Sequence, residues 1–160
     1  MAVDMFLKLD GVQGESRDAK HKQEIDVLSW SWGADQSGKA GSQMGAGAGK
    51  VNVHDIQITK YMDKSSPVLM LYCCNGKHIS KGTLTCRKAG ENPLEYLKID
   101  LEEVIVTNYT TGGTSGDDRQ LESVSLNFAK FKKIYTPQSA SGTAEGSVEH
   151  GWNIAENSKV

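Results

Sequence analysis

The runs IDVLSWSW at residues 25–32 and VNVHDIQITKY at residues 51–61 decide the fold, together with the eighteen residues that separate them. Both runs are rich in β-branched and aromatic residues, which favours strands. The separating segment, residues 33–50, holds six glycines and shows no apolar periodicity. It is much longer than the roughly 2–5 residues of a hairpin connection, and such loops are usually functional or disordered. We therefore expect two strands joined by a long glycine-rich loop.

The first run predicts which side chains face the core. Leu28, Trp30 and Trp32 fall on one face of a strand, opposite Ser29 and Ser31. Ser29 and Ser31 are therefore expected to point away from the core. The aromatic face would suit the wall of a small-molecule-binding β-barrel, but core packing is the commoner use of tryptophan.

The second run leads into the one convincing helix. Ser-Ser-Pro at residues 65–67 places a serine N-cap before a proline suited to the first helical position, and Gly76 closes the other end. The helix is predicted over residues 67–74. Within the run itself the apolar phase slips at His54-Asp55, which predicts a β-bulge or a bend.

Most of the remaining chain predicts strands separated by turns. A second phase slip, at Glu102-Glu103, divides the longest run and predicts a bend there. Further strands are expected over residues 5–9, 83–88, 96–109, 121–135 and 148–154. The pattern is that of a mainly β protein, a small antiparallel β-barrel or sandwich with one short α-helix. We expect one domain over residues 1–160.

Composition disfavours several kinds of partner and compartment. The 18 basic and 20 acidic residues give a net charge of −2 without a basic stripe, so neither nucleic acid nor an anionic membrane is expected to bind. No run approaches the roughly 20 apolar residues of a membrane span, and the N-terminus lacks the regions of a signal peptide. Three cysteines, two of them adjacent at residues 73–74, form no disulfide framework, which fits a reducing cytoplasm.

No stretch carries the pattern of a catalytic, metal or cofactor site. GAGAGK at residues 45–50 departs from the phosphate-binding motif GxxxxGK(S/T). Met44 stands where the first glycine is required, Val51 stands where the hydroxyl residue is required, and a strand follows where the motif needs a helix. The four histidines lack metal-ligand spacing, and no nucleophile elbow occurs. We therefore expect no enzymatic activity and neither metal nor cofactor, and keep an unrecognised hydrolase only as the last of three hypotheses.

Several motifs, dispersed over nearly the whole chain, are more specific than any one of them. They are MAVDMFLKLDGVQGES at residues 1–16, EIDVLSWSWG at 24–33, GKVNVHDIQITKYMDKSSPVLMLYCCNGKH at 49–78, RKAGENPLEYLKIDLEEVIV at 87–106, GDDRQLESVSLNF at 116–128 and GWNI at 151–154. Together they resemble the haemolysin co-regulated protein (Hcp) family, the tail-tube proteins of bacterial type VI secretion systems.

The resemblance implies a β-barrel of two sheets with a flanking helix, assembled as a homohexameric ring whose copies stack into a hollow tube. It implies that a contractile sheath propels the tube, with its spike proteins, out of the cell, and that the lumen carries and protects effectors. The protein would be cytoplasmic before firing and secreted afterwards without a cleaved signal peptide. If the face opposite the core lines the channel, Ser29 and Ser31 are candidate lumen contacts.

The glycine-rich loop is the candidate for contacts between stacked rings. It offers almost no apolar surface, and its glycines make ordering costly at about 1–2 kcal/mol per residue, so docking requires six loops acting together. The candidate ring–ring residues are Gly33, Gln36, Gly38, Lys39, Gly41, Gln43, Met44, Gly45, Gly47, Gly49 and Lys50.

Overall fold

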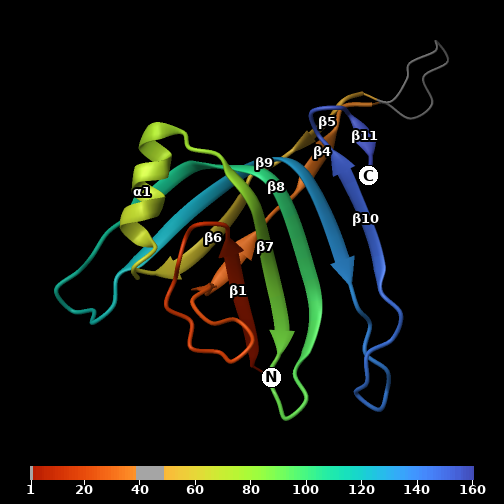
Figure 1. Cartoon of the computed structure of the whole chain (residues 1–160), viewed down its shortest axis with the longest axis horizontal. Coiled ribbons are helices and arrows are strands. Elements are labelled where there is room, and N and C mark those ends of the chain that lie inside the picture. Colours follow the sequence, from red (N-terminus) through yellow and green to blue (C-terminus); the bar gives the residue numbers. More distant parts are fainter. Residues whose placement is uncertain (1, 39–48) are drawn as a thin grey trace.

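The computed structural model describes residues 2–38 and 49–160, and these are mainly β with one short helix (Figure 1). The elements are β1 (Val3–Leu9), β2 (Ile25–Asp26), β3 (Ser29–Ser31), β4 (Ala34–Gln36), β5 (Val51–Val53), β6 (Ile56–Tyr61), α1 (Ser66–Asn75), β7 (Ile79–Lys88), β8 (Leu94–Thr111), β9 (Leu121–Tyr135), β10 (Val148–Asn153) and β11 (Ser158–Lys159). The class predicted from the sequence is confirmed. The short strands β4 and β11 were not predicted.

Nine strands form one wrapped antiparallel sheet, and the other two form a separate arm. The strand order of the main path is β11-β10-β9-β8-β7-β1-β2. The second half of β9 pairs with β10 and its first half with β6, which in turn pairs with β3. In the described residues β4 and β5 pair with each other. The ladder is not closed into a barrel, which corrects the predicted closure. One segment spans the seam, because the N–H of Val27 donates to Met5 in β1 at 2.9 Å and the N–H of Leu28 donates to Thr59 in β6 at 2.8 Å.

This crossing also corrects the predicted alternation of residues 25–32. Val27 is buried and Leu28 is exposed, because the pairing partner changes between them and the phase is reset. Trp30 and Trp32 do pack against the core, and the Trp32 ring meets Phe131 edge-to-face at 4.8 Å. The aromatic face is therefore used for packing, which leaves the small-molecule-binding alternative without support.

Both predicted phase slips are real features of the backbone. The slip at His54-Asp55 is a break between β5, which belongs to the arm, and β6, which belongs to the main sheet. The slip in β8 falls at Glu103, whose φ of 53° lies in the left-handed region, so that Leu101 and Val104 both face the core.

The helix packs across the second half of β8 at one end of the molecule (Figure 1). It covers Ser66–Asn75, close to the predicted residues 67–74, and Leu69 is its fully buried anchor. Gly76 ends it as predicted, with a φ of 65° and its N–H donating to the carbonyl of Tyr72 at 3.0 Å. The predicted serine cap is Ser65 by position only, because its side chain makes no cap hydrogen bond.

A fully buried ion pair fixes the start of the helix to the sheet. The Lys60 Nζ donates to Ser66 Oγ at 3.0 Å and to Glu122 Oε1 at 3.2 Å, and it lies 3.1 Å from Asp63 Oδ1. The second carboxylate oxygen of Glu122 accepts from the hydroxyl of Tyr109. A buried charge with this many partners avoids the cost of an unpaired ion, so the contact holds one geometry between α1, β6 and β9.

Candidate interaction surfaces

Four neighbouring strands present an outer face of small uncharged side chains. Cross-strand pairing places Ser29, Thr59, Ser123 and Thr110 in one row and Ser31, Gln57, Ser125 and Asn108 in the next. We call these eight residues the hydroxyl face. As predicted, Ser29 and Ser31 point away from the core and are exposed.

The hydroxyl face combines weak polar chemistry with a rigid support. Each position offers a hydroxyl or an amide and none carries a charge. The rows are linked, because Gln57 Nε2 donates to Ser123 Oγ at 2.8 Å, and the alternate side chains of the same strands, Ile58 and Val124, are fully buried. Such a face can make and release hydrogen bonds without desolvating an ion.

Ionised groups flank the hydroxyl face and are held in place there. Asp55 accepts from Thr107 Oγ1 at 2.6 Å and from Asn127 Nδ2 at 2.8 Å at one end. At the other end the Arg119 guanidinium lies 3.8 Å from the centre of the Tyr61 ring. The uncharged region is thus bounded by charge of both signs.

The predicted ring–ring loop is only partly a loop. Residues 34–36 form β4, paired with β5, so the two-stranded arm replaces the first part of the predicted irregular stretch. Residues 34–36 show no apolar periodicity of their own, and they form a strand because they pair with residues 51–53 of β5. Of the candidate residues, Gly33, Gln36, Gly38, Gly49 and Lys50 are described, while Lys39, Gly41, Gln43, Met44, Gly45 and Gly47 lie outside the described residues.

Three polar contacts hold the base of the arm. The indole N–H of Trp32 donates to the carbonyl of His54 at 3.0 Å, and the N–H of His54 donates to the carbonyl of Gly33 at 2.9 Å. The His54 ring is also 2.7 Å from Asp35 Oδ2. The arm therefore leaves the sheet at a defined place, beside the end of β3.

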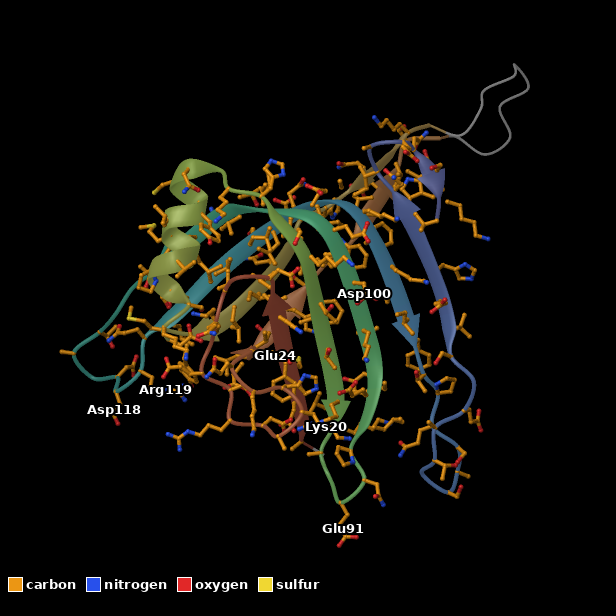
Figure 2. The ribbon with its side chains drawn as sticks, viewed as in Figure 1. Lys20, Glu24, Glu91, Asp100, Asp118 and Arg119 are labelled. Carbon is orange, nitrogen blue, oxygen red and sulfur yellow. The ribbon has the colours of Figure 1, made fainter. Side chains whose placement is uncertain are left out.

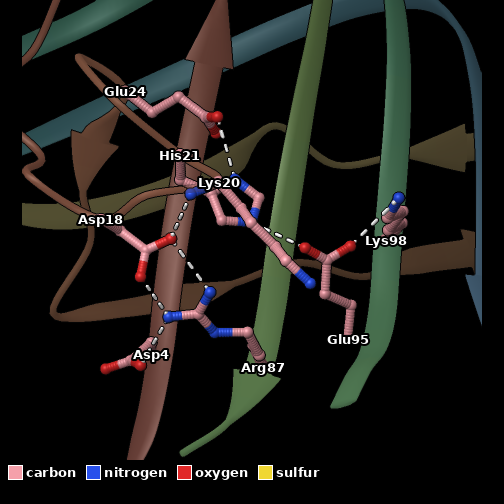
Figure 3. Close-up of polar contacts among 8 residues, drawn as sticks. All are labelled: Asp4, Asp18, Lys20, His21, Glu24, Arg87, Glu95 and Lys98. Atoms are coloured by element: carbon pink, nitrogen blue, oxygen red, sulfur yellow. Dashed lines mark hydrogen bonds and ion pairs between the residues drawn. The ribbon is translucent and has the colours of Figure 1, made fainter. Parts of the chain in front are cut away.

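A cluster of charged side chains on the opposite part of the fold ties residues 13–24 to the sheet; Figure 3 shows it around Arg87. The guanidinium donates to both oxygens of Asp18, at 2.6 and 3.0 Å, and to Asp4 at 3.0 Å. These hydrogen bonds lower the pKa of Asp18 to about 2 and raise the pKa of Arg87 further above its usual range.

His21 forms the second half of this charged cluster. Its ring is 2.9 Å from a carboxylate oxygen of Glu24 and 2.7 Å from one of Glu95, and it stacks on Phe6 with ring centres 4.3 Å apart. Each ring nitrogen of His21 therefore faces one carboxylate. Burial opposes ionisation of Glu95, but hydrogen bonds from His21 and Lys98 outweigh it and lower its pKa.

The side chains of this charged cluster are not arranged as a metal centre. Among residues 2–38 and 49–160, no group of three or more His, Cys, Asp or Glu side chains is arranged to hold a metal ion. In the same part of the chain no helix is long and apolar enough to cross a membrane. The hydroxyl face and the arm are the candidate interaction surfaces in this part of the chain.

Comparison with known proteins gives the family. The family model described as "Type VI secretion system effector, Hcp" matches residues 6–135. Protein hcp1 of Pseudomonas aeruginosa is 55% identical over 159 residues, which cover 98% of each chain. A solved type six secretion system protein superposes with a TM-score of 0.92 at 31% identity, covering 99% of this chain and 100% of its own. Hcp1 from Salmonella typhimurium superposes with a TM-score of 0.80 at 37% identity, covering all of both chains.

The chain therefore belongs to the Hcp family of type VI secretion system proteins, and the resemblance inferred from the dispersed motifs is confirmed. Proteins of this family are secreted structural components of that system and not enzymes.

Proposed function

We propose that this chain is the structural subunit of the inner tube of a type VI secretion system. Six copies form a ring, the rings stack into a hollow tube, and the contractile sheath and spike proteins are its partners during export. Membership of the Hcp family supports this assignment. In this proposal the whole chain, residues 1–160, acts as one tube-subunit domain that is cytoplasmic before firing and secreted afterwards.

The observation that carries the proposal is the hydroxyl face, which we assign to the wall of the lumen. A wall that must hold and then release folded cargo benefits from many weak contacts, each worth about 0.5–1.5 kcal/mol at most. A wall of lysines and carboxylates would retain oppositely charged cargo much more tightly. Ser29 and Ser31 are the candidate effector contacts on the edge strand of this face.

The assembly state tests the proposal directly. Light scattering after size-exclusion chromatography should give about six times the 17.4 kDa chain mass, and negative-stain images should show rings. A monomer at micromolar concentration would contradict the ring.

The lumen assignment has its own test. Ser31→Gln adds bulk to the wall without charge, so the ring should persist while the effector that co-purifies with the wild-type ring is recovered at several-fold lower yield. Ser141→Gln, on an exposed residue outside both the hydroxyl face and residues 33–50, is the matched control. Unchanged recovery with Ser31→Gln, or loss of the ring, would remove Ser31 from the channel.

For the ring–ring contact we propose residues 33–50, of which residues 34–36 are the β4 strand of the arm. Replacing residues 39–48 by a short Gly-Ser linker keeps the β4–β5 pairing, and should keep the ring and its thermal melting while abolishing tube formation. Tubes of normal length from the shortened protein would contradict this role.

A further inference from the structure

A cleft of about 550 Å³ lies between the end of β1 with its following turn and residues 19–24. Its volume is within the range of roughly 300–1,000 Å³ that is usual for ligand pockets. Three lysines line it, Lys8 from β1 and Lys20 and Lys22 from the segment that follows. We call it the lysine cleft. Figure 2 labels Lys20 and Glu24, two of its lining residues, close to β1.

The two carboxylates that line the lysine cleft are each held by another part of the fold. Ser80 Oγ donates to Asp10 Oδ2 at 2.9 Å. A carboxylate oxygen of Glu24 lies 2.9 Å from a ring nitrogen of His21, and Figure 3 shows this contact. The Glu24 side chain is also only 13% exposed. Neither carboxylate forms an ion pair with a lysine of the cleft in the described part of the chain.

The lysines of the cleft, by contrast, are exposed and have no carboxylate partner within residues 2–38 and 49–160. The lysines that do form ion pairs there are Lys60, Lys98, Lys130 and Lys132. Three ammonium groups around one cleft repel one another, and an anion bound between them offsets that repulsion. The lysine cleft therefore offers an anion positive charge that no ion pair in this part of the chain engages.

The backbone around the lysine cleft is fixed by its own hydrogen bonds. The N–H of Gly14 donates to the carbonyl of Gln23 at 2.8 Å, and the N–H of Gln23 donates to the carbonyl of Ser16 at 2.8 Å. A Cβ atom on residue 14 would lie 2.4 Å from the carbonyl oxygen of Glu24, so this close approach requires glycine. A ligand therefore meets a frame that is already ordered, which lowers the entropic cost of binding.

A second hollow, of about 510 Å³, continues the lysine cleft. It shares Lys22 and Gln23 with the cleft and adds Arg17. The Arg17 side chain is exposed and forms no ion pair with the residues that the structure describes. The unpaired cations thus extend beyond one point, and this arrangement suits an anion that carries its charge along a chain better than one with a single charged group.

We propose that the lysine cleft binds a small polyphosphate, a chain of two or more phosphate groups, free or attached to a soluble molecule. An ammonium group is a compact point charge that suits phosphate oxygens, and three of them match several negative charges. The amides of Gln13 and Gln23 add further donors. The cleft lining contains no aromatic side chain that could stack on a base, so the phosphate chain itself is recognised. This site does not depend on the proposed tube.

Titration calorimetry of the full chain with sodium tripolyphosphate, at constant low ionic strength, tests the site. Binding should saturate at one tripolyphosphate per chain, with orthophosphate at least tenfold weaker. Lys20→Gln combined with Lys22→Gln should weaken tripolyphosphate binding about tenfold. The matched control is Lys133→Gln, on an exposed lysine of β9, which β8 and β7 separate from β1. It should leave binding unchanged, and thermal melting checks that every variant is folded.

Three results would overturn the inference. The first is the absence of saturable binding to the wild-type chain, and the second is an equal loss of affinity in Lys133→Gln and the double variant, which would show attraction by net charge alone. The third concerns what is recognised. A nucleoside triphosphate should bind as tightly as tripolyphosphate, and a nucleotide that binds more than about tenfold tighter would assign recognition to the base. Because binding is counted per chain, the oligomeric state of the protein does not affect the outcome.

Discussion

The two halves of β9 carry opposite kinds of outer surface. The first half presents Ser123 and Ser125 within the hydroxyl face, and the second presents Lys130 and Lys132, each in an ion pair with a carboxylate of a neighbouring strand. Both halves belong to the same hydrogen-bonded ladder with β8. The backbone therefore accommodates either surface.

The difference shows that the fold does not require uncharged side chains at the outward positions of β9. Outward positions on a sheet commonly carry charged pairs, which cost little when exposed, and the second half of β9 uses them. Eight neighbouring positions on four strands, none with an ionisable side chain, thus need a reason outside stability. Contact with a moving cargo supplies that reason, and the predictions below separate stability from function in the two halves.

The largest expected effect lies beneath the hydroxyl face, at the buried ion pair. Lys60→Met leaves the Glu122 carboxylate buried without its cation, and should lower the free energy of unfolding by about 3–5 kcal/mol. Urea denaturation at fixed protein concentration measures it. Lys60→Met with Glu122→Leu should recover part of the loss, because no unpaired charge remains. A loss below about 1 kcal/mol for the single variant would contradict the buried-pair argument.

A smaller loss of stability is expected from the ion pairs of Arg87, at the other end of the sheet. Asp18→Asn removes the main partner of Arg87, and should cost about 1–2 kcal/mol at pH 7 after allowance for partial exposure. The matched control is Glu91→Gln, an exposed carboxyl in the β7–β8 turn (Figure 2), which should change unfolding little.

The pH dependence sharpens this prediction. The pKa of Asp18 is about 2 in the folded protein, against 3.8 for an unperturbed carboxyl group. The ionised carboxylate therefore stabilises the fold fully above pH 3.8, and this stabilisation is lost as the pH falls toward 2. The difference between wild type and Asp18→Asn should therefore shrink toward zero near pH 2. A difference that stays constant from pH 7 to pH 2 would assign the contribution to packing instead.

The sequence predicted those features that depend on neighbouring residues. Alternation located β9, β10 and the outward direction of Ser31, and the phase slips located the break before β6 and the bend at Glu103. Gly76 at the end of the helix followed from backbone chemistry alone.

The remaining features depend on residues that are distant in the sequence. Arg87 meets Asp18 across 69 residues and Lys60 meets Glu122 across 62, so no local pattern contains either pair. Periodicity predicts which residues of one strand point outward. It does not predict which residues of the neighbouring strands lie beside them, so the rows of the hydroxyl face could not be predicted from the sequence. Whether the sheet closes into a barrel depends on distant residues as well, because closure is decided where residues 25–32 change partners, and here the ladder stays open.

The smallest expected effect on stability is the most informative about function. Ser125→Asp introduces one charge into the hydroxyl face at a partly exposed position, where the unfolding free energy should change by no more than about 0.5 kcal/mol. If this face contacts cargo, the charge adds a desolvation cost to each bound state in all six copies, and effector recovery should fall several-fold while the ring persists. Lys132→Asp, on the lysine half of the same strand, brings a larger change in charge to a surface that already carries ion pairs. It should leave effector recovery unchanged. Equal losses from the two variants would show that net charge alone, and not the uncharged rows, determines how the cargo is held.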